Sequence, residues 1–261
     1  MKKGQQAGTD ASDFTIAFID IETRPIIGYT WGIYEQDLVG RKQDWAMISF
    51  AVKYAGKKRA EVYALPDFPL YKKDKISDYD LCAKLWEVMD GADLVVAHNG
   101  DRFDIPKINA RLIHHGFNPP SPYKTLDTKK MAKRTFAFTS NKLDDLGSEL
   151  KLGQKLQTGG FGLWLGCMEG DMKSWKKMKE YNGQDVILLE KLYDRLLPWS
   201  PSYVNRNVYD ATHDNCPRCG GHKMQSRGFR ATTSGRRARL QCQDCGGWAQ
   251  GGFIKMGVTV R

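Results

Sequence analysis

The sequence predicts an α/β fold, in which helices flank a mixed β-sheet, followed by a small cysteine-rich domain. The first observation is the order of elements, because a group of strands comes first and strands then alternate with helices. The second is that four of the six cysteines form two C-x-x-C pairs near the end of the chain. At about 150 residues per domain, a chain of 261 residues is long enough for one or two domains, which excludes a disordered tail or a mini-protein.

The first predicted elements are mostly strands. Residues 14–21 form a nearly continuous apolar and β-branched run, which is typical of a strand buried on both faces. Residues 47–54 and 60–65 predict two more strands. A capped helix is expected over 77–89, and 93–97 predicts another short, buried strand.

Helices dominate the next part of the chain. Residues 105–115 and 143–150 predict helices on either side of a short strand over 123–126. The stretch from about 173 to 196 predicts the last helix, because its apolar residues recur at steps of three and four. This succession of elements favours a layered α/β domain with a mixed sheet.

Positive charge is concentrated near the end of the chain. Forty Lys and Arg residues against 30 Asp and Glu residues give a formal net charge of +10. Residues 198–261 hold 10 basic and three acidic residues and so account for +7, while residues 1–197 hold 30 and 27 and account for +3. Such an excess is typical of proteins that meet a polyanion.

The chain is expected to divide near two prolines, Pro198 and Pro201, because neither can continue a helix. The expected divisions are a flexible tail over 1–13, a first domain over 14–197, a linker over 198–209 and a second domain over 210–261. No apolar run approaches the ~20 residues of a membrane span, and the polar N-terminal segment lacks the features of a secretion signal. We therefore expect a cytoplasmic protein without a membrane partner.

Acidic side chains occur in segments that otherwise predict buried elements. Asp20 and Glu22 lie two residues apart at the end of the first strand, so both project from the same face. Asp104 ends a polar segment after the fourth predicted strand, at the sheet edge where ligands gather in α/β folds. Asp185 lies on the apolar stripe of the last helix. A carboxylate directed at the core is costly unless it is hydrogen-bonded, paired or bound to a metal.

A shared divalent cation is the simplest explanation for this set. Hard oxygen ligands without a neighbouring His or Cys favour magnesium or manganese over zinc. Each motif alone leaves a simpler interpretation open. Asp20 and Glu22 fit a strand end that reaches solvent, and Asp104 fits a helix N-cap.

Taken in order, the three motifs resemble the exonuclease motifs of the DEDD superfamily, in its tyrosine-type branch (DEDDy). The matching segments are Asp20-Ile-Glu22, Asn99-x-x-x-Phe103-Asp104 and Tyr181-x-x-x-Asp185. The tyrosine type is indicated because the position five before Asp185, a histidine in the other branch, is Glu180. The resemblance covers roughly residues 14–197.

This family has a ribonuclease H-like fold and comprises 3′–5′ exonucleases and the proofreading domains of DNA polymerases. The resemblance implies phosphodiester hydrolysis with two Mg²⁺ or Mn²⁺ ions. Asp20, Glu22 and Asp185 would hold the ion that activates the attacking water, and Asp104 would help to hold the second. Tyr181 would orient that water, because a pKa of about 10 makes tyrosine a poor base at neutral pH.

The C-terminal cysteines predict a structural zinc site. The pairs are Cys216 with Cys219 and Cys242 with Cys245, each followed by glycine and separated by 22 residues. Four thiolates complete the tetrahedral coordination of one Zn²⁺, whereas a dithiol redox centre, the alternative, needs only one pair. The module resembles the zinc-ribbon family, with strands expected over 223–232 and 237–241.

Candidate substrate contacts come from both domains. In the ribbon, the arginines expected to bind nucleic acid are Arg227, Arg230, Arg236, Arg237 and Arg239. Arginine pairs with phosphates, and the interleaved Phe229 and Trp248 offer rings for exposed bases. A solvated charged face or a protein contact is the alternative. In the first domain Asn99 and Phe103 are the candidates, with turn formation and packing as their alternatives.

The sequence therefore predicts a metal-dependent 3′–5′ exonuclease that releases nucleotides from DNA 3′ ends. Single-stranded ends are favoured, because a site around a terminal nucleotide does not easily accommodate a paired one. The ribbon is expected to bind nucleic acid, with DNA preferred over RNA, and a replication or repair partner fits such a module. RNA trimming, cleavage of branched structures and a non-catalytic nucleic-acid-binding module remain the alternatives.

Overall fold

The computed structural model describes residues 14–34, 37–209 and 214–256, so the tail expected over 1–13 lies outside it. In this structure the chain forms two compact units. The α/β unit comprises Thr15–Lys133 and Ala137–Leu192. The C-terminal unit is formed mainly by the chain from Tyr193 onward.

A five-stranded mixed sheet organises the α/β unit, as predicted. Its strands are β1 (Ile16–Arg24), β4 (Ala46–Tyr54), β5 (Glu61–Ala64), β6 (Leu94–Ala97) and β7 (Lys124–Asp127). Their order is β5-β4-β1-β6-β7, with β1 antiparallel to β4 and parallel to β6. Strands β1 and β4 are rich in apolar residues. Strand β4 is buried along its length except at its last residue, because helices cover both faces of the sheet.

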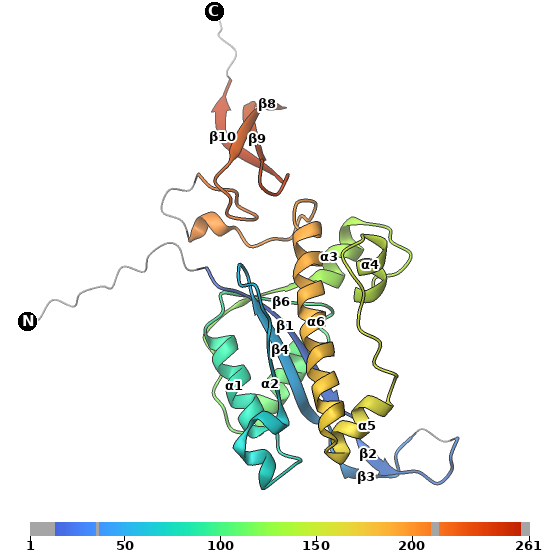
Figure 1. Ribbon diagram of the computed structural model, residues 1–261. Helices are drawn as coiled ribbons and strands as arrows, with labels where there is room; N and C mark the ends of the chain where they lie inside the picture. The colour runs from blue at the N-terminus through green and yellow to red at the C-terminus, as the bar shows by residue number, and fades with distance from the viewer. Residues whose placement is uncertain (1–13, 35–36, 210–213, 257–261) are drawn as a thin grey trace, which may run out of the picture. The chain divides into compact units, whose positions relative to one another are not determined.

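Helices cover the two faces of this sheet (Figure 1). The helices α1 (Tyr79–Asp90) and α2 (Asp104–His114) lie on one side, and α6 (Met172–Leu196) lies on the other. Lys53 of β4 forms an ion pair with Glu190 of α6, which fixes α6 to the face that also carries Asp20. The contact of Lys84 in α1 with the Tyr63 ring belongs to the opposite face.

Shorter elements complete the α/β unit. These are β2 (Ile27–Tyr29), β3 (Gly40–Gln43), α3 (Thr128–Thr135), α4 (Leu143–Glu149), α5 (Gly162–Glu169) and the 3₁₀ turns η1 (Leu65–Asp67) and η2 (Pro69–Lys72). The sequence predicted α4 but not β2, β3, α3 or α5. Each of those four is short, so its hydrophobic pattern covers too few residues to show a period.

The C-terminal unit contains a three-stranded antiparallel sheet. A 3₁₀ turn, η3 (Arg206–Val208), precedes β8 (Met224–Thr232), β9 (Gly235–Cys242) and β10 (Trp248–Lys255). Their order is β10-β9-β8. Two of these strands match the expected ones, whereas β10 was not predicted. Among the described residues, no helix has the length and apolar character needed to cross a bilayer.

Candidate active site

Strand β1 presents two carboxylates to the layer formed by α6. Asp20 and Glu22 alternate with Ile19 and Ile21, so the acids point to one face and the apolar residues to the other. One carboxylate oxygen from each of Asp20, Glu22 and Asp185 lies within 4.8 Å of the other two. Two elements that are far apart in the sequence therefore form one cluster.

Helix α6 contributes Asp185 and the residue that holds Asp20. The Asp185 side chain is completely buried. One turn earlier, Asn182 donates from Nδ2 to Asp20 Oδ2 at 2.6 Å and to the Asp20 carbonyl oxygen at 3.1 Å. Its Oδ1 accepts from the Ser49 hydroxyl at 3.0 Å, so Asn182 is itself fixed by β4. This network sets the orientation of the Asp20 carboxylate.

Asp104 contacts β1 along the edge of that strand that β6 leaves unpaired. Strand β6 pairs with β1 only as far as Phe18, so the following backbone N–H groups of β1 need another partner. The Asp104 Oδ1 supplies one, accepting from the Ile21 N–H at 3.2 Å. Asp104 thus sits beside the backbone between Asp20 and Glu22, at the start of α2.

A tight turn after β6 makes this placement possible. Asn99 adopts a left-handed φ of 67°, a conformation that asparagine tolerates better than most residues. A Cβ on Gly100 would collide with the Cβ of Ala97, so only glycine fits there. The Asn99 N–H donates to Asp127 Oδ1 at 2.9 Å, which ties the turn to the end of β7.

Lys155 and Tyr181 complete the polar contacts around Asp185. The Lys155 Nζ lies 2.6 Å from Asp185 Oδ2 and donates to the Tyr181 hydroxyl at 2.9 Å. The Lys155 backbone N–H donates to Asp144 Oδ1 at 2.7 Å, which anchors the loop at the start of α4. The Tyr181 ring packs edge-on against Trp164 of α5.

Burial raises the pKa of every carboxyl group in the cluster. For Asp20 the neighbouring charges, with Glu22 foremost, add to this effect. Burial and the charge of Asp185 raise the pKa of Glu22 to about 8, and burial raises that of Asp104 to about 7. Burial also raises the pKa of Asp185, although Lys155 opposes the shift. Without an added cation, the full set of negative charges is therefore unfavourable.

The donor set fits hard divalent cations. All four side chains offer carboxylate oxygens, the ligands that Mg²⁺ and Mn²⁺ prefer. Within the described parts of the chain, Lys155 is the basic residue that pairs with this cluster, through Asp185 Oδ2. One positive charge does not balance four carboxylates, and bound divalent cations would compensate for the remainder.

The other two candidates of this unit have different surroundings. The backbone oxygen of Asn99 accepts from Phe103 N at 3.0 Å, so Asn99 shapes the turn. The Phe103 side chain is 39% exposed, with Lys107 over its ring. Phe103 is therefore accessible to a ligand instead of being packed beneath the site.

The four C-terminal cysteines form a second cluster. Their sulfur atoms lie within 4.8 Å of one another, with Cys216 and Cys245 separated by 3.8 Å and Cys219 and Cys242 by 3.7 Å. Metal–sulfur bonds of about 2.3 Å in a tetrahedron imply separations of about 3.8 Å. The two turns repeat one geometry, with Gly220 and Gly246 both at a left-handed φ, 75° and 78°. The cysteines thus fit a single zinc ion.

Three residues that contact the acidic cluster or its neighbours were not among the predicted site residues, namely Asn182, Lys155 and Trp164. Asn182 had a detectable signal, because it is a polar residue at helical spacing among the apolar ones of α6. Lys155 lies in a segment without periodicity, and Trp164 lies in a short helix with little amphipathic character. Only the folded arrangement brings these two to the site.

The α/β unit is similar to known proteins in sequence pattern and in fold. Residues 17–197 match the family model of the RNase H superfamily, and the chain belongs to that superfamily. A solved family B DNA polymerase from the hyperthermophilic archaeon Pyrobaculum calidifontis is structurally similar, with a TM-score of 0.54 and 15% sequence identity. The similarity covers 85% of this chain and 32% of the polymerase, so the chain spans about a third of that protein. No curated protein sequence matches.

Proposed function

We propose that this protein is a metal-dependent 3′–5′ exonuclease of the DEDDy type that acts on DNA, preferentially on single-stranded ends. The observation that carries the proposal is the convergence of Asp20, Glu22 and Asp185, with Asp104 adjacent, in a fold of the RNase H superfamily. These acids come from β1, α2 and α6, so chance clustering along the sequence does not account for them.

The chain would hold two divalent cations. Asp20, Glu22 and Asp185 would bind one Mg²⁺ or Mn²⁺ ion, and Asp104 would contribute to the second. When bound, such ions supply the positive charge that stabilises the attacking and leaving oxygens of phosphodiester hydrolysis. Asn182 keeps the Asp20 carboxylate turned toward the cluster.

Tyr181 orients the attacking water in this proposal. Burial and the charge of Asp185 raise the pKa of Tyr181 above its ordinary value, so its hydroxyl stays protonated at neutral pH. A protonated hydroxyl is unsuited to act as a base but suited to hold a water molecule by hydrogen bonds. Lys155 positions this hydroxyl and Asp185 together, because its Nζ contacts both.

The C-terminal unit is proposed to be a zinc ribbon that binds nucleic acid. One Zn²⁺ held by the four cysteines would be structural, since four thiolates leave no open coordination position. The positive charge of this part of the chain supports a polyanionic ligand. Asn99 and Phe103, beside Asp104, remain proposed substrate contacts in the α/β unit.

The test is hydrolysis of oligonucleotides labelled at either end. With Mg²⁺ or Mn²⁺, a 5′-labelled single strand is expected to shorten stepwise, while a 3′-labelled strand releases a labelled mononucleotide at once. Matched DNA, RNA and 3′-blocked strands report on the sugar and on polarity. Products cut internally from a 3′-blocked strand would contradict exonuclease action, and the absence of any metal-dependent product would contradict nuclease activity.

A further inference from the structure

The register of the C-terminal sheet separates its arginines between two faces. In an antiparallel sheet, directly paired residues share a face, as do residues two apart on one strand. Arg237 pairs with Arg230 of β8 and with Phe253 of β10, and Arg239 lies two residues further along β9. These four side chains therefore project from one face.

Two further residues belong to the same face. Trp248 pairs with Gln241, which lies two residues after Arg239 on β9. Arg227 donates from Nε to Gln241 Oε1 at 3.2 Å, which places it on this side of the sheet. We call the resulting surface the arginine face. It comprises Arg227, Arg230, Arg237, Arg239, Trp248 and Phe253.

Arg236, which the sequence groups with the other arginines as a candidate nucleic-acid contact, lies on the opposite face and is not part of this surface. It pairs with Ala231 and Ile254, and its guanidinium stacks over the Phe229 ring at 4.2 Å. Phe229 in turn pairs with Ala238, two residues from Arg236. The chain thus contains an arginine and an aromatic residue of the same kind on the other side, which serve as matched controls.

The arginine face has the charges and rings of a site for an anionic, stacking ligand. Among residues 214–256, Lys223 forms an ion pair with Asp244. No arginine of the arginine face forms an ion pair with a carboxylate of the described residues. The guanidinium of Arg239 lies 4.9 Å from the Trp248 ring centre, and that of Arg237 lies 5.1 Å from the Phe253 ring centre. Both rings keep exposed surface, 43% for Trp248 and 41% for Phe253.

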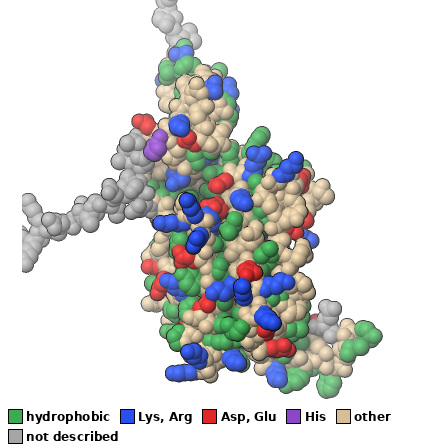
Figure 2. All heavy atoms as spheres, in the orientation of Figure 1, with side chains coloured by type: hydrophobic (Ala, Val, Ile, Leu, Met, Phe, Trp, Pro, Cys, Tyr) green, Lys and Arg blue, Asp and Glu red, His purple; other side chains and the backbone are tan. Residues whose placement is uncertain are grey.

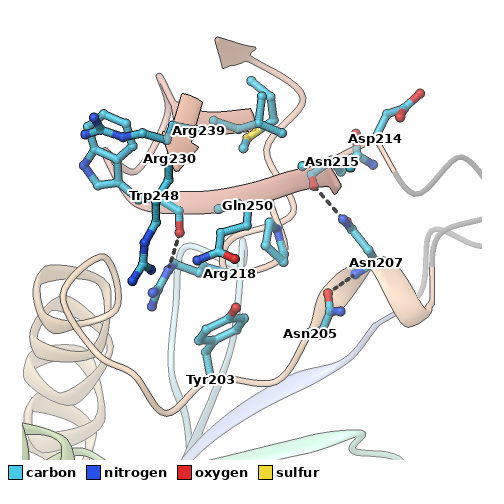
Figure 3. A pocket seen from close by; sticks show the side chains of 16 residues that line it. Tyr203, Asn205, Asn207, Asp214, Asn215, Arg218, Arg230, Arg239, Trp248 and Gln250 are labelled. Carbon is cyan, nitrogen blue, oxygen red and sulfur yellow. Dashed lines mark hydrogen bonds between the residues drawn. The ribbon is translucent and has the colours of Figure 1, made fainter. Parts of the chain in front are cut away.

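A hollow of about 1020 Å³ within the C-terminal unit adjoins these side chains. Arg230, Arg239 and Trp248 line it from the sheet, and Tyr203 lines it from the segment before η3 (Figure 3). Its volume lies at the upper end of the about 300–1,000 Å³ of typical ligand pockets. On the side of the α/β unit shown in Figure 2, basic and acidic side chains are interspersed.

We propose that the arginine face binds single-stranded nucleic acid, with phosphates on the guanidinium groups and unpaired bases on Trp248 and Phe253. Stacking on these rings requires exposed base faces, which a duplex hides in its own stack. This inference rests on the proposed nuclease function, which makes nucleic acid the expected ligand. It adds the surface that binds the strand.

Binding is tested with the entire 261-residue chain carrying Asp20→Asn, which separates binding from hydrolysis. For a fluorescent 20-nucleotide single strand, Trp248→Ala is expected to raise Kd at least about 5-fold, while Trp248→Phe restores most of the affinity. Arg239→Ala should reduce the slope of log K against log salt by about 0.7. Phe229→Ala and Arg236→Ala should leave both quantities near wild type.

Zinc content is measured for every variant, so that loss of the fold is distinguished from loss of the surface. The inference is overturned if Phe229→Ala and Arg236→Ala weaken binding as much as their counterparts. It is also overturned if a blunt duplex binds as tightly as the single strand. If the wild-type protein hydrolyses DNA but Trp248→Ala and Arg239→Ala bind the strand normally, only the proposed binding surface is refuted. If binding depends on the arginine face but the wild-type protein hydrolyses nothing, only the proposed nuclease function is refuted.

Discussion

At the scale of single residues, Asp20 illustrates the conflict between folding and function. Burial and neighbouring acids raise its pKa, so its ionised form is unfavourable in the folded protein without a cation. Asp20→Asn removes this charge and keeps the shape. We expect a metal-free melting temperature equal to or above that of wild type, no stabilisation by Mn²⁺, and no hydrolysis. Thermal unfolding with and without Mn²⁺ measures this, and an equal Mn²⁺-induced shift in both proteins would contradict the cation site.

Lys155 is the residue-scale feature that links Tyr181 to Asp185. Lys155→Ala leaves both groups less well positioned, and misplacement of about 1 Å can lower a rate about 100-fold. We therefore expect kcat on a single-stranded oligonucleotide to fall about 100-fold, with a smaller change in KM. Lys177→Ala is the matched control, because it removes the same charge from an exposed position on α6. An unchanged kcat in Lys155→Ala would exclude the positioning role.

At the scale of elements, His98 connects the end of β6 to two later segments. Its ring contacts the Thr128 hydroxyl at 2.8 Å and the Asn141 carbonyl oxygen at 2.9 Å. Burial lowers the pKa of His98 from 6.5 to about 4. Between these values the unfolded chain binds more protons than the folded one, so stability is lost as the pH falls from 6.5 to 4.

This loss amounts to about 3 kcal/mol when the folded-state pKa is passed. His98→Gln retains a donor for the Asn141 carbonyl oxygen but does not titrate. Between pH 6.5 and 4, the free energy of unfolding of the wild-type protein should therefore fall by this amount more than that of the variant. Urea unfolding at several pH values provides the comparison, and the carboxyl groups common to both proteins cancel. Parallel stability profiles for the two proteins would show that His98 does not carry this dependence.

The packing of α4 against α6 depends on Gly147. A Cβ there would lie 2.7 Å from the Gly153 carbonyl oxygen and 3.0 Å from the Leu188 side chain. Gly147→Ala is therefore expected to cost about 1–3 kcal/mol, and it should also lower activity because Gly153 begins the segment that carries Lys155. Gly162→Ala is the control, since nothing lies within 4 Å of its added Cβ. Chemical denaturation measures the free energy of unfolding of both variants. Equal values for the two would contradict the packing role of Gly147.

At the scale of the whole molecule, the two units are expected to respond differently to metal removal. One zinc per chain is predicted, and structural zinc contributes about 10–16 kcal/mol to the folding of small domains. A thiol-reactive reagent should release this zinc and unfold the C-terminal unit, while the α/β unit retains its unfolding transition. Metal analysis and circular dichroism measure both effects. Cys82→Ala, a substitution in the core of the other unit, should keep the zinc, whereas Cys242→Ser should lose it.

The α/β architecture was predictable because its long elements carry complete periods. The runs at β1 and β4 and the stripe of α6 span enough residues to show their burial. The hairpin of β2 and β3 and the helix α5 are too short for this, and β10 carries Gly251 and Gly252 within its run. Their conformation depends on contacts made after the larger elements assemble.

The order of the main elements was predictable from the sequence, as were the four acids and the four cysteines, because spacing and residue chemistry are local properties. Contacts between distant segments determine which other groups join these acids. Lys155 and Asn182 reach Asp185 and Asp20 through packing between segments distant in the chain. The irregularity between Ser226 and Phe229 shifts the alternation of β8, so Arg227 shares a face with Arg230. Pairing across strands, which no single segment encodes, assigns Arg236 to the other side.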